Sequence, residues 1–428
     1  MSFIDDLKSV ASSKATIILS GLATSIIIAR ILGPEKNGII AALTVYPSIF
    51  MKFGSLGIGQ STTHFVGSQK YDVKEIFNTI NHIWIITALT STVACYLLIH
   101  FFNESSGDLI LIILAILHIP FTLFNTYYSG YYLGRNRIKD YNLIFWLPGI
   151  LSLISVIFLV IVFKLDIYGA LLAGITGPFI ISLVILKRIK GFSINFKSLN
   201  TKLLRDMLSL GLIYALALLV INLNYKVNII ILDQLSTPHE IGIYTKGAHL
   251  IEYLWQIPML LSTLVFARSS IAKDGIGFSI KVAQLLRISV LLIISLSIVL
   301  FFFSDLIIHI FFGKEFAESS GVLKIMIPGV VLLTIFKVLN MDLAGKGKPW
   351  VSIFAMLPAL IINIFLNIVL IPRYGANGAA ISSTISYSLG GILFVIVYSK
   401  TVKVSIKTIL SYKHDDINVV LNMLKSRT

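Results

Sequence analysis

Long apolar runs separated by short polar segments make up most of the chain. Twelve of these runs are long enough to cross a bilayer, since a transmembrane helix needs about 20 mainly apolar residues. We predict helices, because a lone strand cannot satisfy its backbone in lipid and the alternating segments of an outer-membrane barrel are missing from the pattern. The predicted spans are 15–32, 39–62, 79–102, 108–133, 142–163, 169–188, 207–232, 241–267, 288–303, 322–343, 350–371 and 377–399.

The basic residues between these spans lie mainly on one side of the predicted membrane. The termini and every second loop, together with Lys187 and Arg188 at the adjoining end of the sixth span, hold 25 Lys and Arg residues, whereas the alternate loops hold four. Basic loops are retained in the cytoplasm, so we predict that both termini are cytoplasmic. The first run leads directly into further spans with no small-residue cleavage site, which indicates a retained span rather than a signal peptide.

Composition and charge agree with a membrane protein. Of the 428 residues, 56% are hydrophobic and 13% are charged, against about 45–50% and about 25% in soluble domains. The net charge of +15 lies in the short loops, so we predict no nucleic-acid partner. The single cysteine, Cys95, excludes a disulfide within the chain.

A weak internal repeat divides the spans into two sets of six. Pro34 and Gly38 match Pro238 and Gly242 at an offset of 204 residues (238 − 34), each pair in the first external turn of its half. The triplets 168–170 and 374–376 both read Tyr-Gly-Ala, in the last external turns, at an offset of 206 (374 − 168). Chance is the alternative, because Pro and Gly are common in tight turns.

From the repeat and the loop at 188–205 we predict an all-α polytopic membrane protein with two pseudo-symmetric six-helix lobes around a central cavity. Transporters with this plan rock one lobe against the other. The predicted domains are an N-terminal lobe at 1–190, a cytoplasmic linker at 191–206, a C-terminal lobe at 207–400 and a cytoplasmic tail at 401–428.

Four motifs, three in external turns and one (53–60) in the second predicted span, resemble those of polysaccharide exporters in the multidrug/oligosaccharidyl-lipid/polysaccharide superfamily. They recur in order along the chain, at 29–38 (Ala-Arg-Ile-Leu-Gly-Pro-Glu-Lys-Asn-Gly), 53–60, 240–248 and 374–380. The resemblance implies a flippase of the bacterial inner membrane that moves undecaprenyl-diphosphate-linked oligosaccharides, O-antigen or capsule repeat units, to the outer leaflet by alternating access. The implied partners are this lipid-linked oligosaccharide and membrane lipids, with the polysaccharide polymerase and chain-length machinery as further candidates.

One position departs from the family pattern. Many relatives have a basic residue followed two positions later by Asp in the seventh span, whereas this chain has Lys226 and Asn228. The amide in place of the carboxylate puts carboxylate-dependent cation coupling at this position in doubt.

Charged residues inside the predicted spans are mainly basic. An ionised group at the bilayer centre costs at least about 2.5–3.5 kcal/mol, so each calls for a physical reason. Lysine and arginine bind phosphate oxygens well, so the excess of cations favours an anionic cargo over a cationic drug. The candidates for contact with the diphosphate are Lys52, Lys226, Lys246 and Arg30.

Instead of binding the cargo, these charged side chains could form ion pairs within the protein or reach the membrane interface. Glu252 is the one carboxylate that we place well inside a span, and it is a candidate, with His249, for coupling or for an ion pair with Lys246. Arg30 and Lys337 have the alternative of reaching the membrane interface with their long side chains. Candidates for contact with the sugars are Asn125, Tyr128, Asn224 and Asn228. For the Asn and Tyr residues of the fourth span, hydrogen bonding between helices is the favoured alternative.

No enzyme signature is present in the sequence. There is no glycine-rich phosphate-binding loop followed by Lys-Ser or Lys-Thr, and no His/Cys pairs have metal-site spacing. We therefore predict a transporter without catalytic residues, cofactor or metal. Export of an anion would run downhill in the membrane potential, worth about 2.3 kcal/mol per charge per 100 mV.

Three further functions compete with the flippase. A cation-coupled multidrug antiporter of the same superfamily would be expected to have carboxylates deep in the first lobe. A polysaccharide polymerase or ligase would need a large external loop, and the longest one here is about 304–321. A scaffold of the polysaccharide machinery without transport activity would tolerate neutral replacements of Lys52 and Lys226.

Overall fold

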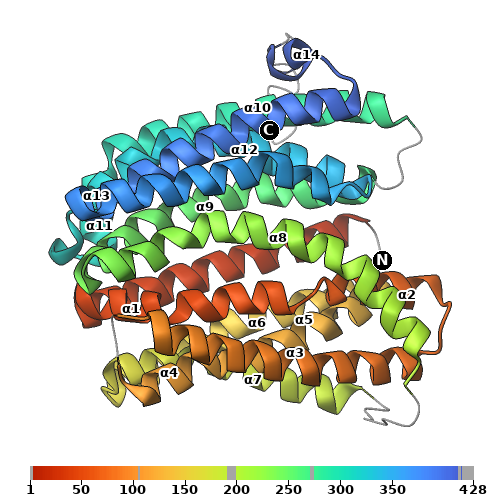
Figure 1. Ribbon diagram of the computed structural model, residues 1–428, viewed down its shortest axis with the longest axis horizontal. Helices are drawn as coiled ribbons and strands as arrows, with labels where there is room; N and C mark the ends of the chain where they lie inside the picture. Colours follow the sequence, from red (N-terminus) through yellow and green to blue (C-terminus); the bar gives the residue numbers. More distant parts are fainter. Residues whose placement is uncertain (1–2, 105–106, 190–198, 270–273, 413–415, 417–428) are drawn as a thin grey trace. The chain divides into compact units, whose positions relative to one another are not determined.

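The computed structural model describes residues 3–104, 107–189, 199–269, 274–412 and Asp416 (Figure 1). This part of the chain is almost entirely helical, and no β-strand occurs in it. Nine of its helical segments are long and apolar enough to cross a membrane. The chain is therefore a multi-pass helical membrane protein, as its hydropathy predicts.

Two of the nine segments each contain two predicted spans. They cover Ser12–Ser68 and Pro349–Val402 and are 57 and 54 residues long. The first is broken at Gly33, with φ 71°, and the second at Gly375, with φ 50°. Glycine tolerates these positive φ angles because it has no Cβ, so it allows the chain to turn between spans. The predicted span 241–267 coincides with a further helix, α9 (Pro238–Ser269).

By Cα packing the chain divides into two compact units. The first comprises Met1–Asn222 with Leu232–Gly242, and the second comprises Leu223–Ile231 with Ile243–Thr428. The long helix α8 (Thr201–Leu235) thus contributes residues 223–231, near its C-terminal end, to the second unit and the residues on either side to the first. The lobe boundaries at 190 and 207 stay a prediction.

The first unit is built on the N-terminal helices. Its helix α1 packs against α6, α2 against α5, and α6 against α7. The helices are α1 (Phe3–Gly54), α2 (Ile58–Ser68), α3 (Val73–Phe102), α4 (Leu109–Ile116), α5 (His118–Gly134), α6 (Ile138–Val156), the π-helical turn Ile157–Val162 and α7 (Asp166–Arg188).

The second unit contains the remaining helices, with α9 from Ile243 onward, and residues 223–231 of α8. Its helix α12 packs along α13, and α10 packs along α12 (Figure 1). The helices are α9, α10 (Gly275–Phe302), α11 (Ser304–Phe312), α12 (Ser319–Gly345), α13 (Ile353–Val402) and α14 (Ile406–Leu410), with 3-10 turns at Lys314–Phe316 and Pro349–Ser352.

The second predicted span, 39–62, is not one continuous helix in the structure but is divided between α1 and α2. The helix α1 ends at Gly54 and α2 begins at Ile58, and between them Leu56 and Gly57 have φ angles of 45° and 63°. At Gly57 an added Cβ would overlap the backbone of Gly211. The break therefore lies where the first unit brings two stretches of backbone together.

The first-turn motifs of the predicted repeat contact each other reciprocally within the first unit. A Cβ added at Gly38 would overlap the carbonyl oxygen of Pro238, and a Cβ added at Gly242 would overlap that of Pro34. Each motif thus supplies one proline carbonyl and one glycine to the same kind of contact. This exchange is expected of parallel repeats related by a twofold axis.

Candidate functional site

A small pocket in the second unit gathers charged and aromatic side chains from several helices. Its cavity volume is about 20 Å³, which is room for about one water molecule. The lining side chains therefore lie mainly against one another. Those with polar or aromatic groups are Tyr225 and Lys226 of α8, Tyr244, Thr245, His249, Glu252 and Trp255 of α9, and Tyr387 of α13.

The centre of this pocket is an ion pair between α8 and α9. Lys226 Nζ lies 3.3 Å from Glu252 Oε1, and the two side chains are 27% and 38% exposed. The sequence suggested Lys246 as a partner for Glu252, whereas the structure pairs this carboxylate with Lys226. Because each charge offsets the other's desolvation, the pair lowers the cost of placing both groups within a span.

A second lysine, Lys337 of α12, faces the aromatic side of the same cluster. Its Nζ lies 4.5 Å from the ring centroid of Tyr225 and 4.2 Å from that of Trp255. A cation above a Trp or Tyr face is attracted by the negative face of the ring. For Lys337 the sequence left open that its side chain reaches the membrane interface, and the structure brings it beside the pocket.

The rings that receive Lys337 pack on each other and on a third ring. The centroid of Tyr225 lies 5.3 Å from that of Trp255 and 5.7 Å from that of Tyr387, and the last two are 5.5 Å apart. Such edge-to-face and tilted contacts are the favoured arrangements of aromatic pairs. The three rings form one wall of the site, and sequence reasoning found neither Trp255 nor Tyr387.

Of the two other predicted residues of α9, His249 lies in the pocket and Lys246 packs against a neighbouring helix. His249 lines the pocket. Lys246 is buried, and its Nζ lies 5.6 Å from the ring centroid of Phe312. Within this unit the structure therefore brings together Lys226, His249 and Glu252 among the predicted charged residues and directs Lys246 to an aromatic neighbour.

Beside the pocket, four fully buried asparagines connect α8 with α13. Asn363 Nδ2 donates to the carbonyl oxygen of Asn224 at 3.0 Å, and Asn367 Nδ2 donates to Asn228 Oδ1 at 2.7 Å. Ser386 Oγ donates to Asn224 Oδ1 at 3.1 Å. Asn224 and Asn228, expected as sugar contacts, thus hydrogen-bond to a neighbouring helix. The partners Asn363 and Asn367 were missed, although their i, i+4 spacing within a span is visible in the sequence.

The predicted sugar contacts of the first unit are also engaged by neighbouring helices. Asn125 Nδ2 donates to the carbonyl oxygen of Pro178 at 2.9 Å and Asn125 Oδ1 accepts from Ser182 Oγ at 3.0 Å. Tyr128 Oη donates to Asn81 Oδ1 at 2.6 Å. Both side chains are buried and link α5 to α7 and α3, which is the alternative that the sequence left open.

The predicted cations of the first unit are exposed. Arg30 lies three residues before the kink at Gly33, and Lys52 lies in the last turn of α1 rather than in the middle of a span. The position of Lys52 follows from the break between α1 and α2. Their contact with a diphosphate stays a prediction.

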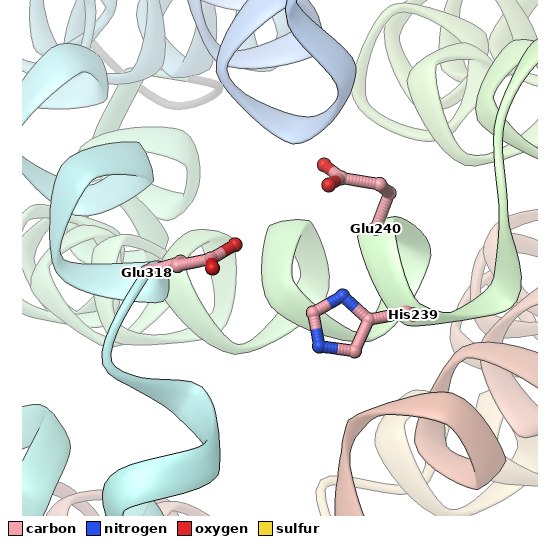
Figure 2. A group of neighbouring side chains, drawn as sticks. All are labelled: His239, Glu240 and Glu318. Atoms are coloured by element: carbon pink, nitrogen blue, oxygen red, sulfur yellow. The ribbon is translucent and has the colours of Figure 1, made fainter.

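Some side chains capable of metal binding lie at helix starts (Figure 2). His239 and Glu240 are in the first turn of α9 and belong to the first unit, whereas Glu318 directly precedes α12 in the second unit. Acidic residues are favoured at helix N-termini because they interact with the positive end of the helix dipole. The positions of Glu240 and Glu318 are those that the helix dipole favours for a carboxylate.

Two family models match the chain. The model described as "Polysaccharide biosynthesis protein" matches residues 7–267, and that described as "MatE" matches residues 262–369. Among similar proteins, the capsular polysaccharide biosynthesis protein CapF of Staphylococcus aureus is 24% identical over 394 residues, covering 90% of this chain and 96% of CapF.

Further relatives match over shorter segments. The "Probable low-salt glycan biosynthesis flippase Agl15" of Haloferax volcanii is 26% identical over 178 residues, which are 38% of this chain and 37% of that protein. The multidrug export protein MepA of Staphylococcus aureus is 31% identical over 100 residues, 22% of each chain. The chain thus spans little more than a third of Agl15 and less of MepA.

Solved structures share the fold. The lipid II flippase MurJ in its inward closed conformation has a TM-score of 0.76 at 18% identity, over 94% of this chain and 88% of MurJ. An inward-facing multidrug resistance MATE transporter has a TM-score of 0.72 at 16% identity, over 93% and 98% of the two chains. These structures show the fold, and the family model that matches residues 7–267, more than half of the chain, shows the family. The chain belongs to the polysaccharide biosynthesis protein family of the multidrug/oligosaccharidyl-lipid/polysaccharide superfamily.

Proposed function

We propose that this protein is a flippase that moves undecaprenyl-diphosphate-linked oligosaccharide units, an O-antigen or capsule repeat, from the cytoplasmic to the outer leaflet of the bacterial inner membrane. The observation that carries the proposal is the charge of the pocket in the second unit. Lys226 and the carboxylate Glu252 line it, and a second lysine, Lys337, lies beside it on the rings of Tyr225 and Trp255. A likeness to CapF over 90% of the chain supports a cargo of this class.

The diphosphate would take the place of Glu252 beside Lys226. A lysine ammonium is a compact charge with three donors, so it can exchange one carboxylate oxygen for a phosphate oxygen without a fixed geometry. The single contact of 3.3 Å and the exposure of both side chains suit such an exchange. The aromatic wall of Tyr225, Trp255 and Tyr387 offers flat apolar surfaces beside the charges, which suit sugar rings.

Binding requires the pocket to open. A volume of about 20 Å³ is far below the roughly 300–1,000 Å³ of sites for small molecules. The helices that line it would therefore separate when the cargo enters, as alternating access requires. Lys52, Arg30 and Lys246 are further proposed contacts of the diphosphate along this path.

The driving force we propose is the membrane potential and removal of the product. The buried asparagines beside Lys226 are neutral, and Glu252, the acidic side chain that contacts Lys226, is engaged by it in an ion pair rather than left to hold a coupling cation. A diphosphate leaving a negative interior gains about 2.3 kcal/mol per charge per 100 mV if its charge crosses the field. The termini are proposed to be cytoplasmic, and the chain is proposed to act without catalysis, beside a polysaccharide polymerase.

A cation-coupled multidrug antiporter is the second candidate. It is favoured by the MatE match to residues 262–369 and the similarity to MepA. The excess of lysines around Glu252 argues against it, because a cationic drug would face two positive charges.

Reconstitution in proteoliposomes tests the flippase. We expect Lys226→Ala to reduce flipping of a lipid-linked oligosaccharide at least tenfold, because a hydrogen bond to a charged group is worth about 1.5–3 kcal/mol. Lys324→Ala is the matched control, since Lys324 pairs with Asp305 away from the pocket. Unchanged flipping by the Lys226 variant, or efflux of cationic dyes by the wild type with no flipping, would overturn the proposal.

A further inference from the structure

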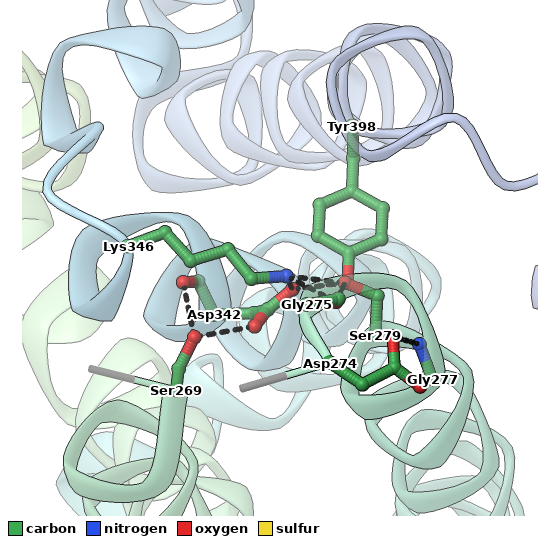
Figure 3. A network of polar contacts seen from close by, with 8 residues as sticks. All are labelled: Ser269, Asp274, Gly275, Gly277, Ser279, Asp342, Lys346 and Tyr398. Atoms are coloured by element: carbon green, nitrogen blue, oxygen red, sulfur yellow. Dashed lines mark hydrogen bonds and ion pairs between the residues drawn. The ribbon is translucent and has the colours of Figure 1, made fainter. Parts of the chain in front are cut away.

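A buried carboxylate at one end of the second unit holds four helices together (Figure 3). Asp342 of α12 is fully buried and accepts hydrogen bonds from Ser269 of α9 at 2.6 Å and Ser279 of α10 at 2.8 Å. It also accepts from Tyr398 Oη of α13 at 2.7 Å and Lys346 Nζ at 2.8 Å. Since a buried charge is costly unless it is paired and hydrogen-bonded, this network fixes its members in place.

The network fixes Lys346 in particular. In addition to Asp342, its Nζ donates to the carbonyl oxygen of Gly275 at 3.0 Å and to Ser279 Oγ. These three partners use the three protons of the ammonium. Lys346 therefore contributes a fixed positive charge to the pocket that it lines, and it has no proton left to donate to a ligand.

Beyond Lys346 lies an open pocket with a volume of about 360 Å³. Two further lysines line it, Lys348 after the end of α12 and Lys403 at the end of α13, and both are exposed. Lys403 has a φ of 59°, a left-handed conformation that is uncommon for a residue with a Cβ. The volume is within the usual range for a bound small molecule, about 300–1,000 Å³.

The residues at the start of α10 that line the pocket are chemically different from the lysines. Asp274 lines it, and its Oδ1 accepts the backbone N–H of Gly277 at 2.9 Å at the start of α10. Ile276, also in the lining, is 51% exposed and presents an apolar surface. The pocket thus combines two lysines, a carboxylate that can accept hydrogen bonds, and an apolar edge.

The pocket lies at the side of the protein whose loops are rich in basic residues, which we predict to be cytoplasmic. Trp350, two residues after Lys348, is exposed, and exposed Trp residues are typical of the membrane interface. Basic pockets between transmembrane helices on this side bind the head groups of anionic lipids. The position of the pocket, its two exposed lysines and the apolar side chain of Ile276 therefore indicate that its ligand is an anionic lipid rather than a soluble anion.

We propose that this pocket binds the head group of a hydroxylated anionic phospholipid such as phosphatidylglycerol. The phosphate lies between Lys348 and Lys403, the glycerol hydroxyls donate to Asp274, and the acyl chains leave over Ile276. The carboxylate repels a bare phosphate and accepts from hydroxyl groups, so it selects for the hydroxylated head group. This lipid is a resident of the inner leaflet and is distinct from the transported cargo.

The proposal is tested with the purified full-length chain by native mass spectrometry in detergent. The probes are phosphatidylglycerol, phosphatidic acid, phosphatidylcholine and inorganic phosphate. We expect one phosphatidylglycerol to bind, with weaker binding of the other three. Each lysine near an anionic surface contributes about fivefold in affinity, so Lys348→Ala with Lys403→Ala should weaken binding by about 25-fold.

The matched control removes two lysines at the same end that do not line the pocket, Lys400→Ala with Lys407→Ala, and should change affinity less than twofold. Asp274→Ala should reduce the preference for phosphatidylglycerol over phosphatidic acid. Both pairs of substitutions are at exposed positions, and equal thermal unfolding without added lipid checks that they fold. Equal loss in the control pair, or equal binding of inorganic phosphate, would overturn the lipid site.

Discussion

Two ion pairs in the second unit are built in opposite ways. Lys226 and Glu252 make one contact of 3.3 Å, and both side chains are more than a quarter exposed. Arg287 of α10 and Asp416 are 4% and 1% exposed. They meet through two contacts, Nε to Oδ2 at 2.6 Å and Nη2 to Oδ1 at 2.9 Å.

The second pair also completes the hydrogen bonding of the arginine. Arg287 Nη1 donates to the carbonyl oxygens of Thr408 and Ile409 at 3.0 and 3.1 Å. A planar guanidinium in a two-point contact is geometrically specific, whereas a lysine ammonium is a mobile point charge. The comparison teaches that the pair of Arg287 holds the tail to α10, while the pair of Lys226 leaves room for a competing anion.

The largest expected effect comes from breaking the buried pair. Asp416→Ala leaves Arg287 buried without its carboxylate, which costs about 3–5 kcal/mol of stability. Thermal and denaturant unfolding in detergent measure this loss. A double variant, Arg287→Met with Asp416→Leu, removes both charges and should be more stable than the single variant. A single variant as stable as the wild type would contradict the assignment of the pair as a holding contact.

A charge reversal sharpens the comparison at the pocket. Lys226→Glu with Glu252→Lys restores an ion pair, so its stability should be close to that of the wild type. Flipping should stay reduced at least tenfold, because the cation that faces the cargo has moved to another helix and a charged hydrogen bond is worth about 1.5–3 kcal/mol. Recovery of flipping in the double variant would show that only the pairing matters and not the position of the lysine.

The smallest effect is expected at an exposed pair. A hydrogen bond from Lys324 Nζ, at 2.8 Å, lowers the pKa of the Asp305 carboxyl, and the Asp305 side chain is 68% exposed. An exposed pair of this kind contributes at most about 1 kcal/mol. Because the folded pKa is lowered, the contribution is present above the usual pKa of the carboxyl and is lost as pH falls through the lowered value.

Unfolding of Asp305→Asn and the wild type at neutral and acid pH measures this contribution. The difference in stability between the two proteins should be small at neutral pH and should vanish in acid. A difference that grows in acid would have the wrong sign for a carboxyl with a lowered pKa.

The spans could be predicted from the sequence because hydropathy is a local property of each run. The charged groups of the site could be predicted as well, since Lys226 and Glu252 stand out in apolar surroundings. The pairing of Lys226 with Glu252 could not, because it depends on how α8 packs on α9. The other proposed partner, Lys246, lies six residues before Glu252 in the same helix, a spacing that puts the two side chains on different faces. The hydrogen bonds of Asn363 and Asn367 could not be predicted either, because they depend on how α13 packs against Asn224 and Asn228 of α8.

Asp416 shows a different limit. It is 129 residues from Arg287, in a polar tail whose composition gives no sign of a buried group. Two charged residues in predicted loops are ordinarily solvated, so nothing local identifies this pair as buried. The contacts of Thr408 and Ile409 with the same arginine are made by backbone carbonyls, which carry no information about residue type.

The reciprocal contact of Gly38 with Pro238 and of Gly242 with Pro34 limits which residues these two distant segments tolerate. Each glycine faces a proline carbonyl of the other segment, about 200 residues away along the chain. A methyl group gained at either glycine therefore has to be accommodated by a shift of the other segment's backbone. The two glycines thus set how closely two stretches of backbone approach each other inside the first unit.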